Sequence, residues 1–255
     1  MFDVNVKIGH WPYRPVRDGD AVLAALMAMG VQTAAVSSLD AVHYLNPQDG
    51  NDALAAFLAD RPDSGIRIVP LAVMRPGFSG WQDDLRRCID EYGMRGILLH
   101  PNYHEYTLED TEVAPILDEA ARRGLPVFVQ MSMEDVRRQF RPYKTQDVPP
   151  EAVGAFARAW PDVNIVALGL KFGQPEAVGE PWPENLYFDI SNYEHLGELE
   201  HAVARFGAGR LLYGSNMPMF NPRANADKLR CAALDEADHD AIAFRNAERI
   251  LGSLP

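Results

Sequence analysis

Three ionisable side chains of this sequence, Lys7, His100 and Asp189, are candidates for catalysis. Each lies in or directly after a short apolar run, where a folded chain can hold it in a buried site. His100 titrates near neutral pH and is the best single candidate for a general acid or base. Asp189 can act as a base, and Lys7 can orient a carboxylate or stabilise an oxyanion. Each also has a structural alternative, in which Lys7 and Asp189 are ion-pair partners and His100 is a satisfied core residue.

Lys7 belongs to the stretch 2–9, in which polar and apolar residues alternate with a period of two. This period predicts a β-strand with one apolar face and one face that carries Asp3, Asn5 and Lys7. A half-solvated edge strand is the simplest interpretation. A loop rich in aromatic and basic residues follows directly, and it favours a strand whose polar face lines a pocket.

Further short apolar runs alternate with amphipathic segments along the rest of the chain. The expected strands after the first are 33–37, 66–73, 96–99, 125–129, 164–168, 186–190 and 210–213. The expected helices are 20–29, 51–59, 81–92, 112–123, 150–160, 196–206, 224–234 and 241–251. Eight strands that alternate with helices predict one α/β domain over residues 1–255, a parallel (β/α)8 TIM barrel. A doubly wound sheet is the main rival. The stretches 141–150 and 173–184 are expected to be long loops, the second in the place of a helix.

The carboxyl ends of barrel strands form the usual site of chemistry, so the polar residues that follow the runs are candidate ligands of a substrate. These candidates are Asn5, Tyr13, Arg75, Gln130, Lys171, Asn192, Ser215 and Asn216. Arginine can bind an anion through its planar fork, and the amides can recognise carbonyl and hydroxyl groups. The alternative is that the basic residues tie loops to the rim and that the amides bond to one another.

Four segments in this order resemble the amidohydrolase-related (amidohydrolase 2) family. They are Gly96-Ile-Leu-Leu-His-Pro, Glu119-Ala-Ala-Arg-Arg-Gly-Leu-Pro-Val, Leu212-Tyr-Gly-Ser-Asn-Met-Pro and Arg245-Asn-Ala-Glu-Arg-Ile-Leu. The resemblance runs over nearly the whole chain. It implies a (β/α)8 barrel of hydrolases, lactonases or decarboxylases that act on small, often carboxylated or cyclic substrates. It also implies a divalent metal held by His-x-His on the first strand, by histidines that end strands five and six, and by an aspartate that ends strand eight.

The metal ligands that the resemblance implies are replaced in this chain. Asn5-Val6-Lys7 stands at the His-x-His, Gln130 and Gly169 stand near the two further histidines, and Asn216 replaces the aspartate. Amides and an ammonium group are poor substitutes for imidazole and carboxylate ligands. The family's usual divalent metal site is therefore predicted to be lost, with no metal ligand and no cofactor expected.

Composition limits the remaining choices of function. The 255 residues carry 24 Lys and Arg against 36 Asp and Glu, a formal net charge of −12, which argues against nucleic acid or an anionic membrane as a partner. There is no signal-peptide pattern and no apolar run long enough to span a bilayer, so a cytoplasmic protein is expected. The two cysteines give no disulfide framework and are expected to pack on helix faces. The sequence leaves open whether the chain forms a homo-oligomer.

Two functions from different classes remain. The first is a metal-independent hydrolase or lactonase for a small carboxylated substrate, in which Lys7 holds the anion and His100 or Asp189 moves protons. The second is a catalytically inactive barrel that binds a small molecule or a protein partner. Hydrogen-bonding and charged groups stand where the metal ligands would be, and this favours the enzyme slightly.

Overall fold

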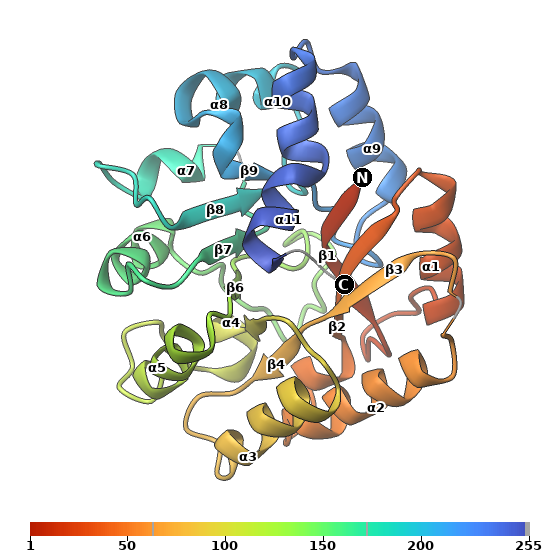
Figure 1. The fold of residues 1–255 in the computed structure, drawn as a ribbon, viewed down its shortest axis with the longest axis vertical. Helices are drawn as coiled ribbons and strands as arrows, with labels where there is room; N and C mark the ends of the chain where they lie inside the picture. Colours follow the sequence, from red (N-terminus) through yellow and green to blue (C-terminus); the bar gives the residue numbers. More distant parts are fainter. Residues whose placement is uncertain (63, 172, 253–255) are drawn as a thin grey trace.

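A ring of short parallel strands surrounded by helices forms the architecture in a computed structural model, which describes residues 1–62, 64–171 and 173–252 (Figure 1). The strands are β1 Phe2–Ile8, β2 Thr33–Ser38, β3 Arg67–Pro70, β4 Ala72–Met74, β5 Ile97–Leu99, β6 Val127–Gln130, β7 Ile165–Leu168, β8 Leu186–Asp189 and β9 Leu211–Leu212. The helices are α1 Gly19–Ala28, α2 Pro47–Ala59, α3 Trp81–Arg86, α4 Pro101–His104, α5 Ala114–Arg123, α6 Pro150–Ala159, α7 Gln174–Ala177, α8 Glu198–Phe206, α9 Pro222–Cys231, α10 Glu236–Asp240 and α11 Asn246–Leu251.

The strands follow one another around the ring in sequence order, in two hydrogen-bonded groups, β1-β2-β3 and β4 to β9. The expected third strand, 66–73, is divided by Leu71 into β3 and β4. Backbone bonds close the ring between its first and last strands: Val4 N donates to Tyr213 O at 3.0 Å, and Lys7 N donates to Met217 O at 2.8 Å. The predicted (β/α)8 barrel is confirmed.

Capping side chains and glycines set where several of the helices begin and end. Asp18 caps α1, because its side chain accepts a hydrogen bond from Ala21 N at 2.8 Å. Helix α5 ends at Gly124, whose φ of 66° is a left-handed conformation that glycine adopts without strain. The expected helix 81–92 is α3 followed by a π-helical turn, Arg87–Glu91. The stretch expected to replace a helix, 173–184, contains the single-turn helix α7.

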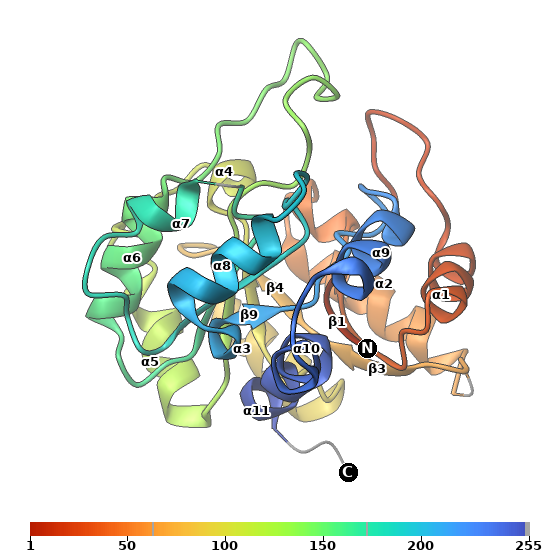
Figure 2. The same ribbon diagram turned by 90° about the horizontal axis from the view of Figure 1, so that it is seen from above.

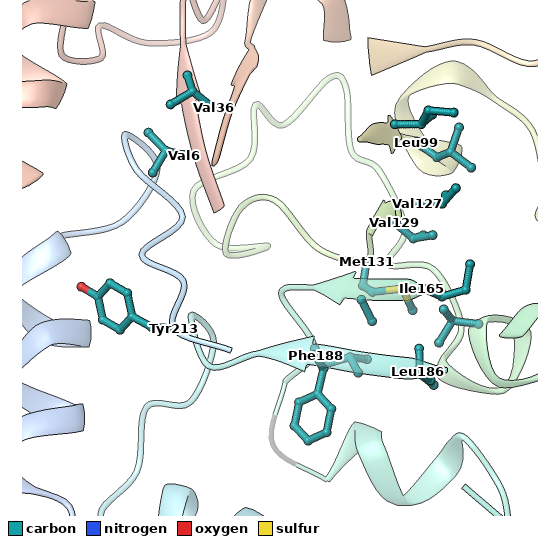
Figure 3. Close-up of a cluster of buried hydrophobic side chains, with 14 of the residues drawn as sticks. Val6, Val36, Leu99, Val127, Val129, Met131, Ile165, Leu186, Phe188 and Tyr213 are labelled. Atoms are coloured by element: carbon teal, nitrogen blue, oxygen red, sulfur yellow. The ribbon is translucent and has the colours of Figure 1, made fainter. Parts of the chain in front are cut away.

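Two apolar layers hold the barrel together. The outer layer packs strand residues such as Val36, Leu99 and Phe188 against the helices (Figure 3). The inner layer fills the barrel with residues such as Leu98 and Phe128, and α11 adds Ala247, Ile250 and Leu251. Burial of this apolar area supplies the main driving force for folding.

The first strand departs from the strict alternation that its sequence predicts. Val4 packs in the inner layer, whereas Val6 and Ile8 pack in the outer layer. The pairing of β1 with β2 is irregular between Asp3 and Val6, and such a bulge turns the following side chains. Therefore Val4 and Lys7 can both face the interior, although the sequence places them on opposite faces.

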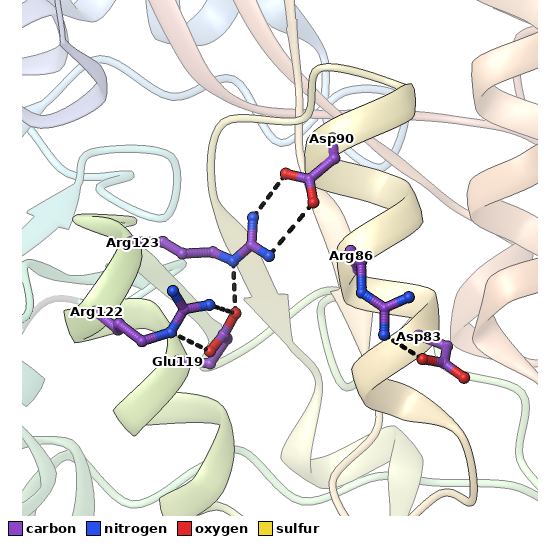
Figure 4. Close-up of polar contacts among 6 residues, drawn as sticks. All are labelled: Asp83, Arg86, Asp90, Glu119, Arg122 and Arg123. Carbon is purple, nitrogen blue, oxygen red and sulfur yellow. Dashed lines mark hydrogen bonds and ion pairs between the residues drawn. The ribbon is translucent and has the colours of Figure 1, made fainter.

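Ion pairs on the surface join neighbouring elements. Arg123 on α5 contacts Asp90 at 2.7 Å and Glu119 at 2.5 Å, as Figure 4 shows. Exposed pairs of this kind contribute about 0–1 kcal/mol each, so the apolar layers dominate stability. No helix in the described part of the chain has the length and apolar character to cross a membrane.

Candidate functional site

A buried polar cluster lies at the carboxyl ends of the strands, on the face from which two long loops project in Figure 2. We call Asn5, Lys7, Asp189 and Asn216 the strand-end network. Lys7 Nζ donates to Asn5 Oδ1 and, at 3.0 Å, to Asn216 Oδ1. Asn5 Nδ2 donates to Asp189 Oδ2 at 2.8 Å. The four side chains are at most 1% exposed, so the polar face of β1 lies inside the protein.

Backbone groups and close packing hold the network in place. Asp189 Oδ1 accepts a hydrogen bond from Gly169 N at 2.7 Å, and Asn216 Nδ2 donates to Met133 O at 2.9 Å. Gly214 leaves room for Asp189, since a Cβ there would lie 2.2 Å from Asp189 Oδ2. Burial raises the pKa of Asp189, while hydrogen bonds from Gly169 and Asn5 and the charge of Lys7 oppose that rise.

Lys7 is a buried ammonium group without a direct counter-ion. It makes no ion pair among the residues that the structure describes, and its acceptors are two neutral amides. Burial lowers its pKa to about 8, although the charges of Asp189 and Asp3 oppose this change. A desolvated cation held by neutral groups is a strong site for an incoming anion.

Asp3 precedes the network residues on β1 and supports them through backbone hydrogen bonds. It was not selected from the sequence as a site residue. Its Oδ1 accepts hydrogen bonds from Asn5 N and Ser215 N, both at 3.0 Å, and thereby joins β1 to the segment after β9. The side chain is fully buried, and burial raises its pKa to about 6. Its place on the polar face beside Asn5 and Lys7 is the signal that could have identified it.

We expect Asp3→Asn to change how stability depends on pH. A carboxyl pKa raised from 3.8 to about 6 stabilises the fold below pH 4, and this stability is lost as the pH rises to 6, by about 3 kcal/mol. Asparagine keeps an acceptor oxygen and has no charge to bury. Urea unfolding at pH 4 and pH 7 should show the variant gaining stability relative to the parent at the higher pH. If the free energies of unfolding of the two proteins differed by the same amount at pH 4 and at pH 7, the pKa of Asp3 would not be raised.

His100 lies beside the network in an apolar and aromatic environment. It is fully buried, and neither ring nitrogen has a hydrogen-bond partner among the described residues. Its ring centroid lies 5.8 Å from that of His104 and 6.4 Å from that of Tyr103. Burial lowers the pKa of His100 well below its ordinary value, and the charges of His104 and Lys7 act in the same direction. The imidazole is therefore neutral at pH 7 and offers one donor and one acceptor.

Gln130, Asn192 and Ser215 are buried near the network and bond mainly to backbone. Gln130 Nε2 donates to Ser132 O at 2.8 Å, and Asn192 Nδ2 donates to Gly169 O at 2.6 Å. Ser215 Oγ accepts a hydrogen bond from Met217 N at 3.2 Å. These bonds fix the loops that follow β6, β7 and β9.

Three further candidates from the sequence lie away from the network and from the buried residues around it. Lys171 pairs with Asp147 on the rim. Arg75 is half-buried near His104, and its charge contributes to lowering the pKa of that histidine. Tyr13 packs among aromatic rings above the strand ends.

The rings around Tyr13 form a cover over the strand ends. We call this cover the aromatic cap; it consists of Trp11, Tyr13, His43, Tyr103, Phe140 and Tyr143. The Tyr13 ring stacks on Phe140 with centroids 5.2 Å apart. Arg14 and Glu134, 2.9 Å apart, join the loop after β1 to the loop after β6, which together carry most of the cap. The cap covers the mouth of the barrel, and this closure was not predicted from the sequence.

A cleft of about 350 Å³ opens beside the cap. Its lining includes Ser132, Lys171 and Asn192, and also Glu134 and Phe220. A volume of this size is at the lower end of small-molecule sites. Asn192 links the cleft to the network, because its amide bonds to Gly169, the residue whose N–H holds Asp189.

Solved structures of decarboxylases share this fold. The chain superposes on 2,6-dihydroxybenzoate decarboxylase from Rhizobium with a TM-score of 0.72 and 18% identity, over 98% of both chains. It superposes on a dihydroxybenzoic acid decarboxylase from Polaromonas sp. JS666, solved with bound manganese, with a TM-score of 0.73 and 16% identity over 98% of this chain and 96% of the other.

The bound manganese corrects one expectation from the sequence. A chain without a divalent cofactor was expected, and a protein of the same fold holds one, which contradicts that expectation. The residues of this chain do not fit such an ion: in the ranges that the structure describes, no three His, Cys, Asp or Glu side chains gather to hold a metal. Lys7 and two amides occupy the strand ends, and an ammonium group repels a cation.

Sequence comparison identifies the family of the chain. The curated 2-amino-3-carboxymuconate-6-semialdehyde decarboxylase of Dictyostelium discoideum is 30% identical over 94 residues, which is 36% of this chain and 24% of that protein. The match thus spans about a quarter of the relative's length. The family model described as amidohydrolase matches residues 7–253, nearly the whole chain. The chain belongs to the amidohydrolase family.

Proposed function

We propose that the chain binds a small carboxylated aromatic substrate at the mouth of the barrel and removes its carboxyl group as carbon dioxide. The observation that carries this proposal is Lys7, a fully buried ammonium group without a direct counter-ion. Burying such a charge is costly, so a function that uses it is favoured over a structural role. The aromatic cap offers a surface on which a substrate ring can pack.

Decarboxylation replaces the hydrolysis or lactone opening that the sequence favoured. The relatives that share the fold are named as decarboxylases of carboxylated aromatic acids, and they support this choice of reaction. A decarboxylase breaks a carbon–carbon bond and needs no water as nucleophile. This requirement agrees with a site that is covered by rings.

The residues of this chain can support each stage of the reaction. Lys7 orients the substrate anion, and the apolar cap disfavours its carboxylate charge relative to neutral carbon dioxide. The bond to the carboxyl carbon breaks and its electron pair stays on the ring carbon. Lys7 then transfers a proton from Nζ to that carbon and regains one from water. Asn5 and Asn216 hold Nζ in position, and the charge of Asp189, which bonds to Asn5, stabilises the ammonium form.

Substrate entry requires the loop that carries Phe140 and Tyr143 to open, since Lys7 is only 1% exposed. Opening separates Arg14 from Glu134 and breaks the bond from Asn216 Nδ2 to Met133 O. These contacts are few, so a loop motion of this kind is accessible.

The direct test is release of carbon dioxide from 2,6-dihydroxybenzoate and other hydroxylated benzoates, with manganese supplied in one arm and omitted in another. Turnover of at least one of these acids supports the proposal. A panel of lactones and amides is run in parallel. Turnover of that panel with no release of carbon dioxide from any acid would reject decarboxylation.

A second function is favoured by the closure of the site. The four network residues bond to one another under the cap, as in a barrel that binds a ligand without chemistry. In that case an aromatic carboxylate raises the melting temperature of the protein while no carbon dioxide is released. The two measurements together separate the two functions.

A further inference from the structure

A second cavity, of about 600 Å³, lies between α8 and α9, outside the strand-end network. Its lining includes Ser191 at the end of β8, Lys228 and Asn225 on α9, and Arg138. None of the four network residues lines it. The cavity thus presents a separate set of polar groups on the face where barrels place their chemistry.

Lys228 is held at the wall of this cavity with donor capacity to spare. Its Nζ donates to Ile190 O at 2.6 Å and to Asn225 Oδ1 at 2.7 Å. An ammonium group has three N–H donors, and these two acceptors are neutral. Lys228 makes no ion pair with any described residue. Burial lowers its pKa to about 8 despite the nearby charges of Asp189 and Glu198.

Ser191 adds an unsatisfied hydroxyl group to the same wall. The side chain is 3% exposed, and its Oγ makes no hydrogen bond of ordinary length to a described residue, although it lies close enough to Asp189 to help lower the pKa of that carboxyl. A buried hydroxyl without a partner costs free energy, which a ligand oxygen in the cavity would recover. Ser191 directly follows Ile190, whose carbonyl accepts from Lys228, and both Ser191 and Lys228 line the cavity.

The acidic residues that line the cavity differ in whether their carboxylates already contact an arginine or a backbone N–H group. Asp227 contacts Arg230 at 3.1 Å and Arg223 at 3.3 Å. Glu200 Oε1 accepts a hydrogen bond from Ala233 N at 2.8 Å. Glu194 is the acidic group that opposes an anion most directly, since it lines the cavity without such a contact among those described.

We propose that this cavity binds the oxyanion group of a small molecule, a carboxylate or a phosphate, through the Lys228 ammonium and the Ser191 hydroxyl. The two donors complement the oxygens of such a group, which in turn supplies the missing acceptor for both. No residue binds in both proposed sites, although Asp189 of the network lies near Ser191 and Lys228. Loss of decarboxylation therefore does not entail loss of oxyanion binding in this cavity.

Calorimetric titration with sodium phosphate and with sodium benzoate tests the proposal in the intact protein, against sodium chloride at equal ionic strength. We expect Lys228→Met to weaken binding roughly 10- to 100-fold and Ser191→Ala by several-fold. Glu194→Gln should tighten binding about two- to fivefold. Lys144→Met is the control for charge, because Lys144 is exposed and lines a different groove.

Cys231 provides a probe of location. It lines the cavity and is exposed, contrary to the expectation that it packs on a helix face, whereas Cys88 is fully buried. Phosphate or benzoate should slow its alkylation by iodoacetamide in the parent and not in Lys228→Met. Protection by phosphate alone identifies a phosphate site, and protection by benzoate alone identifies a carboxylate site. Binding that is equal in Lys228→Met, or reproduced by chloride, would overturn the proposal, as would no binding of either anion.

Discussion

Replacing Lys7 with methionine should reduce kcat/KM for release of carbon dioxide by at least about 100-fold, the usual effect of removing a donor that stabilises developing charge. Methionine fills most of the volume of the lysine stem but offers no ammonium group to orient the substrate or to supply a proton. Steady-state release of carbon dioxide from the best hydroxylated benzoate measures the change.

The matched control for Lys7→Met is Arg95→Gln, which also removes one positive charge. Arg95 is exposed and precedes β5, at the end of the barrel away from the network, so this variant should keep full activity. Circular dichroism and the melting temperature establish that both variants are folded. A folded Lys7→Met protein with activity close to that of the parent would remove Lys7 from the mechanism.

The second large effect concerns stability and is expected for Asn51→Ala. The fully buried Asn51 amide on α2 donates to Val73 O at 2.9 Å and accepts from Val73 N at 3.0 Å, as the backbone of a neighbouring strand would. Alanine leaves both backbone groups of β4 buried and without these partners. At about 1–3 kcal/mol for each group, the loss is about 2–6 kcal/mol, a large part of the stability of a typical domain.

Urea unfolding measures the loss of stability in Asn51→Ala, with Asn164→Ala as the control variant. The Asn164 side chain is exposed, and its truncation should cost no more than about 0.5 kcal/mol. Equal midpoints for the two variants would show that Asn51 does not stabilise β4. Full activity in a strongly destabilised Asn51→Ala protein would still agree with its position away from the network.

Much of the scaffold follows from local patterns in the chain. The apolar runs predicted the strands, because period and length are properties of neighbouring residues. The division of 66–73 at Leu71 and the irregular pairing after Asp3 were not predicted, since both depend on how separate strands meet. Helix α7 was missed because a single turn has no periodic signal.

The candidate site was likewise predicted only as far as local patterns in the chain allow. The polar face of β1 indicated that Asn5 and Lys7 would meet groups from other strand ends, and the structure brings them to Asp189 and Asn216. Sequence could not show the aromatic cap, because Tyr13 and Phe140 meet only through the packing of two distant loops. Lys228 was missed for a related reason: a lysine on a helix has no sequence feature that distinguishes a buried ammonium from a solvated one.

Because the first strand pairs with the last, the barrel can close only late in synthesis on the ribosome. The backbone of β1 bonds to Tyr213 and Met217, and the partner of Lys7 at Asn216 lies 209 residues further along the chain. At a synthesis rate of about 5–20 residues per second, this first strand waits roughly 10–40 s for its last partners. During that interval Lys7 lacks its Asn216 acceptor and Asp3 lacks the Ser215 donor. Nascent chains arrested before residue 213 should therefore lack the site, although most of the helices have already been made.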